Sequence, residues 1–160
     1  MRRVALLAVV AAAAAAAGAA QPARADGDPA SDYLLVRRVF ISYELATRAK
    51  QEQTLIQVVA AANKKGYSIR VAVIASSYDL GSVTVLWRKP QTYARFLGAE
   101  LGFVYRQRLL VVMPNGFGFN WPKHSPKPAY AVLAKLRMTH SGAGLLASAT
   151  SAVQALEKAG

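Results

Sequence analysis

The sequence predicts an α/β fold in which a central mixed β-sheet is covered by helices on both faces, giving three layers. Apolar segments rich in β-branched residues alternate along the chain with segments whose apolar residues recur every three or four positions. Two of the strand-like segments, residues 67–75 and 109–113, are apolar on both faces toward their ends. Strands of that kind are typical of a sheet covered on both sides, so the order of the segments predicts helices on each face.

The first 25 residues have the pattern of a cleavable signal peptide. Arg2 and Arg3 give a positive start, residues 4–17 are an unbroken apolar run, and residues 23–25, Ala-Arg-Ala, form a small-x-small cleavage site. A retained anchor is the alternative, but the run is shorter than the roughly twenty apolar residues that a spanning helix needs. We therefore expect a mature chain that begins at Asp26 and is exported, to a periplasmic, extracellular or cell-envelope location.

The rest of the chain is long enough for one domain with a single hydrophobic core. Residues 26–32, Asp-Gly-Asp-Pro-Ala-Ser-Asp, are rich in turn formers and are expected to be a flexible leader. The domain itself is expected over residues 33–160. The sequence contains no cysteine, which excludes disulfides, thiol catalysis and thiolate metal ligands. The fold must therefore be stabilised by its core.

In the first half of the domain, a strand, a helix and a second strand are predicted. The strand covers residues 34–41, a short apolar segment around two arginines. The helix covers residues 44–65, because four apolar residues recur at helical spacing before Gly66 ends the pattern. The β-branched run at residues 67–75 follows at once as the second strand.

In the second half, Pro90 is expected in the first turn of a helix. Residues 109–113, Leu-Leu-Val-Val-Met, are the expected central strand, and Asn115-Gly116 indicates a type I′ hairpin turn into a further strand. Helices are predicted over residues 129–138 and 142–158, with Ser141 as the N-cap of the second. Core positions expected in and just after the Pro90 helix are Tyr93, Phe96, Leu97, Leu101 and Phe103.

Several of these segments carry a family resemblance. They are Gly-Tyr-Ser-Ile-Arg-Val-Ala-Val-Ile-Ala-Ser at 66–76, Tyr93-Ala94 leading through Leu97 to Leu101, Leu-Leu-Val-Val-Met-Pro-Asn-Gly-Phe-Gly at 109–118, and the closing helix from Ser141 with Ala152-Val153. In this order they resemble the TPM domain family over about residues 34–158. The resemblance implies a three-layer α/β fold outside the cytoplasmic membrane. That family includes a photosystem repair factor with proposed acid phosphatase activity and receptor accessory proteins.

Two polar residues follow predicted strands, at the edge where open α/β sheets bind ligands. Asp79 comes shortly after the strand that ends near Ala75, and Asn115 follows Met113. If they shared a ligand or metal site, it would hold a divalent cation, Ca²⁺ or Mg²⁺, because these ions prefer oxygen ligands. The function would then be a weak metal-dependent phosphatase. The alternatives are a loop turn or cap at Asp79 and the hairpin turn itself at Asn115. No residue is assigned a catalytic role.

The chain is strongly basic, with a formal net charge of +12. Its positive charges are scattered as pairs rather than gathered in one tract, which is typical of a basic surface. No predicted helix concentrates the Arg, Asn and Gln residues that a DNA-recognition helix needs, so nucleic acid is not an expected partner. Outside the cytoplasm, the polyanions available are anionic lipid headgroups and acidic envelope polymers.

The hairpin region is the candidate interaction surface. Phe117, Phe119 and Trp121 alternate with small or polar residues and lead into Lys123. Such a strand is either covered core or an exposed docking edge. The leading hypothesis is a noncatalytic interaction or accessory module that contacts a membrane protein or an anionic envelope surface through this hairpin and the basic surface. The metal-dependent phosphatase is the alternative.

Overall fold

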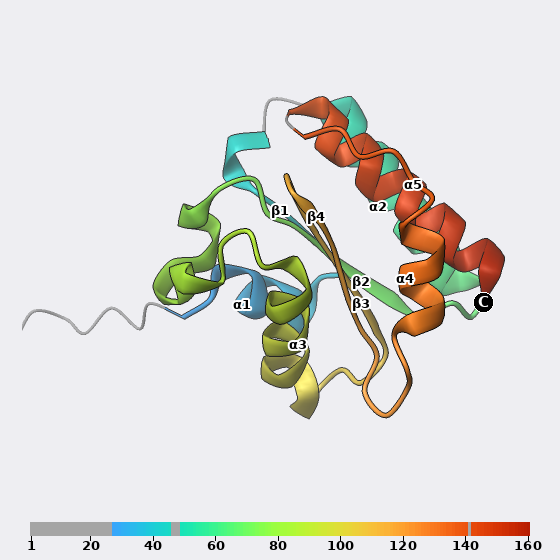
Figure 1. The fold of residues 1–160 in the computed structure, drawn as a ribbon, viewed down its shortest axis with the longest axis horizontal. Helices are drawn as coiled ribbons and strands as arrows, with labels where there is room; N and C mark the ends of the chain where they lie inside the picture. Colours follow the sequence, from blue (N-terminus) through green and yellow to red (C-terminus); the bar gives the residue numbers. More distant parts are fainter. Residues whose placement is uncertain (1–26, 46–48, 141) are drawn as a thin grey trace, which may run out of the picture.

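A computed structural model of the chain describes residues 27–45, 49–140 and 142–160. The predicted signal peptide, Asp26 and the predicted N-cap Ser141 lie outside the described residues. The described part has a mixed α/β fold built on a four-stranded open sheet (Figure 1). None of its helices combines the length and apolar character needed to cross a membrane.

The sheet has the strand order β1-β2-β3-β4. Strands β1 (Val39–Ile41), β2 (Ile69–Val73) and β3 (Arg108–Met113) are parallel, whereas β4 (Gly116–Asn120) is antiparallel to β3. The parallel strands are separated by helices, which allow the chain to cross back to the same end of the sheet. A two-residue turn joins β3 to β4, and this reversal makes the sheet mixed, as the sequence predicts.

The hairpin is confirmed, but its predicted turn type is wrong. The turn residues are Pro114 and Asn115, and Gly116 already begins β4 with φ 153°. A type I′ turn needs positive φ at both central residues. The proline ring holds φ negative, and the described non-glycine residues with positive φ are Arg88 and Lys123. The type I′ conformation is therefore not formed.

One face of the sheet is covered by α2 (Ala49–Lys64), α4 (Lys127–Leu133) and α5 (Ala143–Ala159), with α2 and α5 side by side (Figure 1). The helix predicted over residues 44–65 is confirmed as α2, after the short 3-10 helix η1 (Tyr43–Leu45). The stripe residues Leu55, Val59 and Ala62 are buried. They pack with sheet residues that point to this face: Val71, Val73, Leu110, Val112 and Phe119.

The other face is covered by α1 (Pro29–Val36), α3 (Pro90–Glu100) and the 3-10 segments η2 (Ser77–Leu86) and η3 (Leu101–Phe103). The alternate residues of the same strands point here, which explains why the strands are apolar on both faces. The predicted helix beginning at Pro90 is confirmed as α3. The core on this side contains Phe40, Ala72, Ile74, Tyr93, Leu97, Leu109 and Val111.

The structure corrects the prediction for the start of the domain. Residues 29–36 form helix α1 rather than the end of a flexible leader and the start of a strand, and the strand is limited to β1. Asp28 is the N-cap, with its carboxylate accepting a hydrogen bond from the Ala30 N–H at 3.2 Å. Ala30 and Leu34 are fully buried. The cap and this tertiary burial override the strand preference of the apolar run.

Two smaller predictions also need correction. Phe103 is 94% exposed rather than buried, because the chain turns through η3 after Leu101 has filled the core. The helix predicted over residues 129–138 is shorter and begins earlier, as α4. Pro126 and Pro128 flank its first residue, and proline is readily accepted in the first turn of a helix.

Candidate functional site

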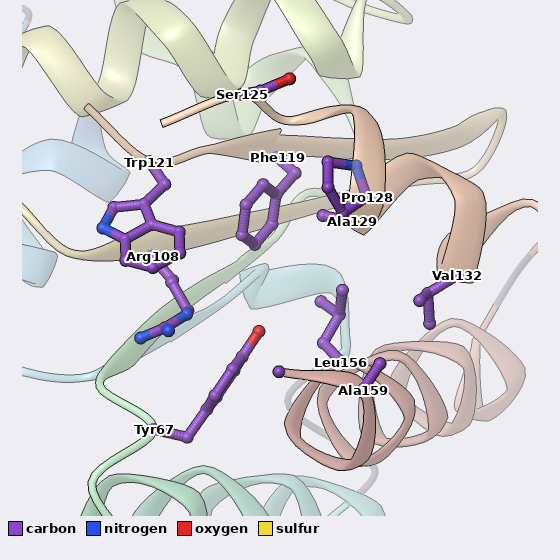
Figure 2. A pocket seen from close by; sticks show the side chains of 11 residues that line it. Tyr67, Arg108, Phe119, Trp121, Ser125, Pro128, Ala129, Val132, Leu156 and Ala159 are labelled. Atoms are coloured by element: carbon purple, nitrogen blue, oxygen red, sulfur yellow. The ribbon is translucent and has the colours of Figure 1, made fainter. Parts of the chain in front are cut away.

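A pocket of about 210 Å³ lies where β2 and β3 begin and β4 ends (Figure 2). Its wall is formed by the hairpin on one side and by α4 and the last turns of α5 on the other (Figure 2). Most of the lining is apolar, and Arg108 and Tyr67 lie against each other at one end of it. The lining residues are Tyr67, Arg108, Phe119, Trp121, Ser125, Pro128, Ala129, Val132, Leu156, Ala159 and Gly160.

The sheet register places Arg108 in this pocket. It is the first residue of β3 and lies opposite Ile69 of β2. Since side chains alternate along a strand, Arg108 points to the same face as Leu110 and Val112, which are core residues of the α2–α5 side. An arginine therefore ends an otherwise apolar row, at the point where the sheet meets solvent.

Two aromatic rings hold the Arg108 guanidinium. Its central carbon lies 4.2 Å from the ring centroid of Tyr67 and 3.9 Å from that of Trp121. Figure 2 shows the guanidinium between these two rings. The His124 ring is stacked on Trp121, with centroids 3.6 Å apart and planes at 10°. Cation–π contacts are worth roughly 0.5–2 kcal/mol each, so the guanidinium is held in place while its N–H groups stay available at the plane's edge.

No Asp or Glu side chain lines the pocket, and Arg108 forms no ion pair with the described residues. Among the described residues, the ion pair that forms is Lys65–Glu157, at 2.8 Å. Burial raises the pKa of Tyr67 despite the opposing effect of Arg108, so its hydroxyl stays protonated at neutral pH. The polar end of the pocket thus offers a guanidinium fork and a phenol, which together suit a carboxylate or phosphate group.

The hairpin residues proposed as an interaction surface have different positions in the structure. Phe119 is 4% exposed and belongs to the core. Phe117 and Trp121 are half-buried and pack against the same core, and Lys123 is exposed. Of the two alternatives for this strand, the structure supports covered core for Phe119, whereas Trp121 presents a ring face to Arg108 in the pocket.

The outer edge of β4 is also covered. The Phe119 N–H donates a hydrogen bond to the Tyr130 hydroxyl at 2.9 Å, and that hydroxyl donates to the Phe119 carbonyl oxygen at 3.2 Å. A side chain from α4 therefore occupies the position that a neighbouring strand would take. Such covering is one way in which proteins protect an edge strand from pairing with another chain.

Asp79 and Asn115 have separate partners in the structure. Asp79 is 4% exposed, and its Oδ2 accepts hydrogen bonds from the backbone N–H groups of Ala75 at 2.9 Å and Ser76 at 3.0 Å. Asn115 is exposed, and its side-chain amide donates to the Arg88 carbonyl oxygen at 2.6 Å. In the described residues, no group of three or more His, Asp or Glu side chains is placed to hold a metal ion. Asp79 thus caps the start of η2, and Asn115 lies in the hairpin turn, as in the alternatives stated for these two residues.

We expect Asp79→Ala to lower the free energy of unfolding by about 2 kcal/mol, because two partly buried N–H groups lose their acceptor. Asp79→Asn keeps an acceptor oxygen and should cost less. The measurement is urea unfolding of both variants beside the parent chain. Equal stability of Asp79→Ala and the parent would contradict the capping role. Because the alanine variant perturbs the fold, Asp79→Asn is also the cleaner test for metal-dependent phosphate release.

The sequence reading did not identify Arg108 and Tyr67 as site residues. They lie on different strand ends and come together with Trp121 only through the sheet register. The one local signal is that a charged residue stands immediately before the apolar run of β3. Its place in the alternation of the strand puts its side chain on the same face as the core residues of that run. His124 is exposed and stacked on Trp121.

The fold and the pocket define a mixed α/β domain with a pocket lined by an arginine, aromatic rings and apolar side chains. Comparison of the chain with protein-family models, curated proteins and solved structures finds no match in any of the three. The resemblance to the TPM family therefore depends on the sequence segments quoted above. The function has to be argued from the geometry of the site.

Proposed function

We propose that the chain is an exported, noncatalytic interaction domain with a TPM-like three-layer fold, which contacts an anionic surface or a membrane protein of the cell envelope. The observation that carries this proposal is the Arg108 guanidinium, held between Tyr67 and Trp121 at the mouth of an apolar pocket, where it forms no ion pair with the described residues. A fixed arginine outside any ion pair favours binding over stability as its role.

The chemistry of the pocket indicates the type of group that it would receive. An anionic oxygen pair would meet the guanidinium fork and the Tyr67 hydroxyl, and an adjoining aliphatic part would lie against the apolar wall formed by Phe119, Val132 and Leu156. An anionic lipid headgroup with its first methylene groups combines these features. The formal net charge is +12 for the whole sequence and +9 once the three arginines of the predicted signal peptide are removed, and it would add a long-range attraction to such a surface.

The test is binding of the purified chain to vesicles of phosphatidylcholine with and without phosphatidylglycerol, at low and high salt. We expect binding only with the anionic lipid, weakening as salt rises. Arg108→Gln should lower the affinity about tenfold, as expected from the loss of a charge-assisted hydrogen bond. Arg137→Gln removes the same charge from an exposed position outside this pocket and should change the affinity much less.

Two results would contradict the proposal. One is equal binding of Arg108→Gln and Arg137→Gln, which would show that net charge alone is responsible. The other is an absence of binding to anionic vesicles at low salt. Thermal unfolding of both variants checks that neither change disrupts the fold.

A further inference from the structure

The opposite edge of the sheet, formed by β1, pairs with no further strand among the described residues, and Val39 on it is 8% exposed. The Val71 N–H donates to the Arg38 carbonyl oxygen and the Ser42 N–H donates to the Val73 carbonyl oxygen, both at 2.9 Å. In a parallel ladder, successive residues turn their backbone groups to opposite sides. The backbone groups of residues 38, 40 and 42 therefore point toward β2. The N–H and C=O groups of Val39 and Ile41 therefore point outward, and no hydrogen bond from another described element reaches them. The β4 edge, by contrast, is covered by Tyr130.

A groove runs along this open edge between α1 and α2. It consists of two adjoining hollows of about 420 and 230 Å³, which share Tyr33 of α1, Val39 of β1 and Ile56 of α2. Large apolar side chains are exposed along it: Val36 by 82% and Tyr43 by 78%. Open backbone groups beside apolar hollows are what an extended peptide needs in order to add a strand to a sheet.

Three arginines stand at the end of the groove where β1 begins. Arg37, Arg38 and Arg70 line the larger hollow, which has no carboxylate in its lining. Arg70 is half-buried, donates to the Leu34 carbonyl oxygen and stacks on the Tyr105 ring at 4.2 Å. Burial is the main cause that lowers the pKa of Arg70; the Tyr105 side chain opposes this effect, and the positive charge of Arg38 adds to it. This end of the groove is therefore complementary to a carboxylate.

We propose that the β1 edge binds an extended peptide segment of a partner protein as an added antiparallel strand, with its acidic C-terminal end at Arg37, Arg38 and Arg70. An antiparallel strand ends where β1 begins, which brings its last residues to the arginines. The alternating outward N–H and C=O groups select a peptide backbone, because a lipid headgroup or a polysaccharide does not repeat donors and acceptors at that spacing. This site is separate from the Arg108 pocket.

The experiment uses a labelled heptapeptide, Thr-Val-Thr-Val-Thr-Asp-Glu, and the intact chain. Fluorescence polarisation measures affinity, and amide hydrogen exchange followed by NMR locates the site. We expect slower exchange at Val39 and Ile41 on binding, with no change around Arg108. An amidated peptide and a peptide ending in Asn-Gln distinguish the free terminal carboxylate from acidic side chains as the source of the charge.

The variants separate backbone pairing from charge. Ile41→Pro removes one outward N–H group while the pairing of β1 with β2 remains, and should abolish binding. Arg37→Gln with Arg38→Gln should weaken binding of the acidic peptide about tenfold or more, whereas Arg137→Gln and Arg108→Gln should leave it unchanged. Thermal unfolding checks the fold of each variant, and the arginine pair, exposed on the surface, tests the site even if the proline variant is unstable.

The proposal is overturned if exchange at Val39 and Ile41 is unaffected at the highest soluble peptide concentration, or if the arginine variants bind as well as the parent. Concentration-dependent protection of these amides without peptide would identify a second copy of the chain as the occupant, and would also overturn it. Because Arg108→Gln is predicted to disturb vesicle binding and not peptide binding, failure of one proposal does not imply failure of the other.

Discussion

Gly118→Ala is expected to lower the free energy of unfolding by about 3 kcal/mol or more, because it forces α3 away from β4. A Cβ at this position would lie 1.8 Å from the Pro90 carbonyl oxygen and 3.0 Å from the Ala94 Cβ. The first of these is backbone, which cannot move aside as a flexible side chain does. The helix as a whole would therefore have to shift from the sheet.

Urea unfolding of the variant beside the parent chain measures this effect. Gly102→Ala is the matched control, because a Cβ there meets no heavy atom within 4 Å, and its stability should differ little from that of the parent. Similar stability of the two variants would contradict the close contact between α3 and β4. The glycine at position 118 of β4 thus has a physical reason: it allows a helix to approach one face of the strand, while Phe119 fills the core on the other.

The second large effect concerns pH. The Asp28 carboxyl is buried, and the Tyr93 hydroxyl lies 2.7 and 2.8 Å from its two oxygens. Burial raises the pKa of Asp28 from 3.8 to about 6 in the folded protein, although the bond from Tyr93 opposes the rise. Between these two pH values the folded state holds more protons than the unfolded state. The contribution of Asp28 is therefore fully present below about pH 4 and is lost as pH rises through about 6, by roughly 3 kcal/mol.

Asp28→Asn removes this titration, so the test is the difference in unfolding free energy between the parent and this variant from pH 4 to pH 7.5. We expect the parent to lose stability relative to Asp28→Asn as pH rises. A constant difference across the range would contradict the raised pKa. Tyr93→Phe should destabilise the protein by about 1–3 kcal/mol at neutral pH, because the buried carboxylate loses a donor.

The local spacing of apolar residues was sufficient to predict many of the helices and strands. The apolar repeat in residues 49–64 and the apolar runs of β2 and β3 predicted their elements, because side-chain periodicity follows directly from helix and strand geometry. It was insufficient at residues 29–36, which were expected to be the end of a flexible leader and the start of a strand but form a helix. There the Asp28 cap and the contacts of Leu34 with distant core residues stabilise the helix. The residues that Leu34 contacts lie far away in the sequence, so the local pattern does not contain them.

The sequence alone determined the mixed α/β class, the helices and strands around the central sheet, and a strongly basic chain that depends on its core. The tertiary structure decided which side chains meet. In the folded chain, Asp79 caps a helical segment, Phe119 lies in the core, and Arg108 lies between the rings of Tyr67 and Trp121. The physical reason is that strand register and helix packing join residues far apart in the chain, and neither is encoded in the spacing of any single segment.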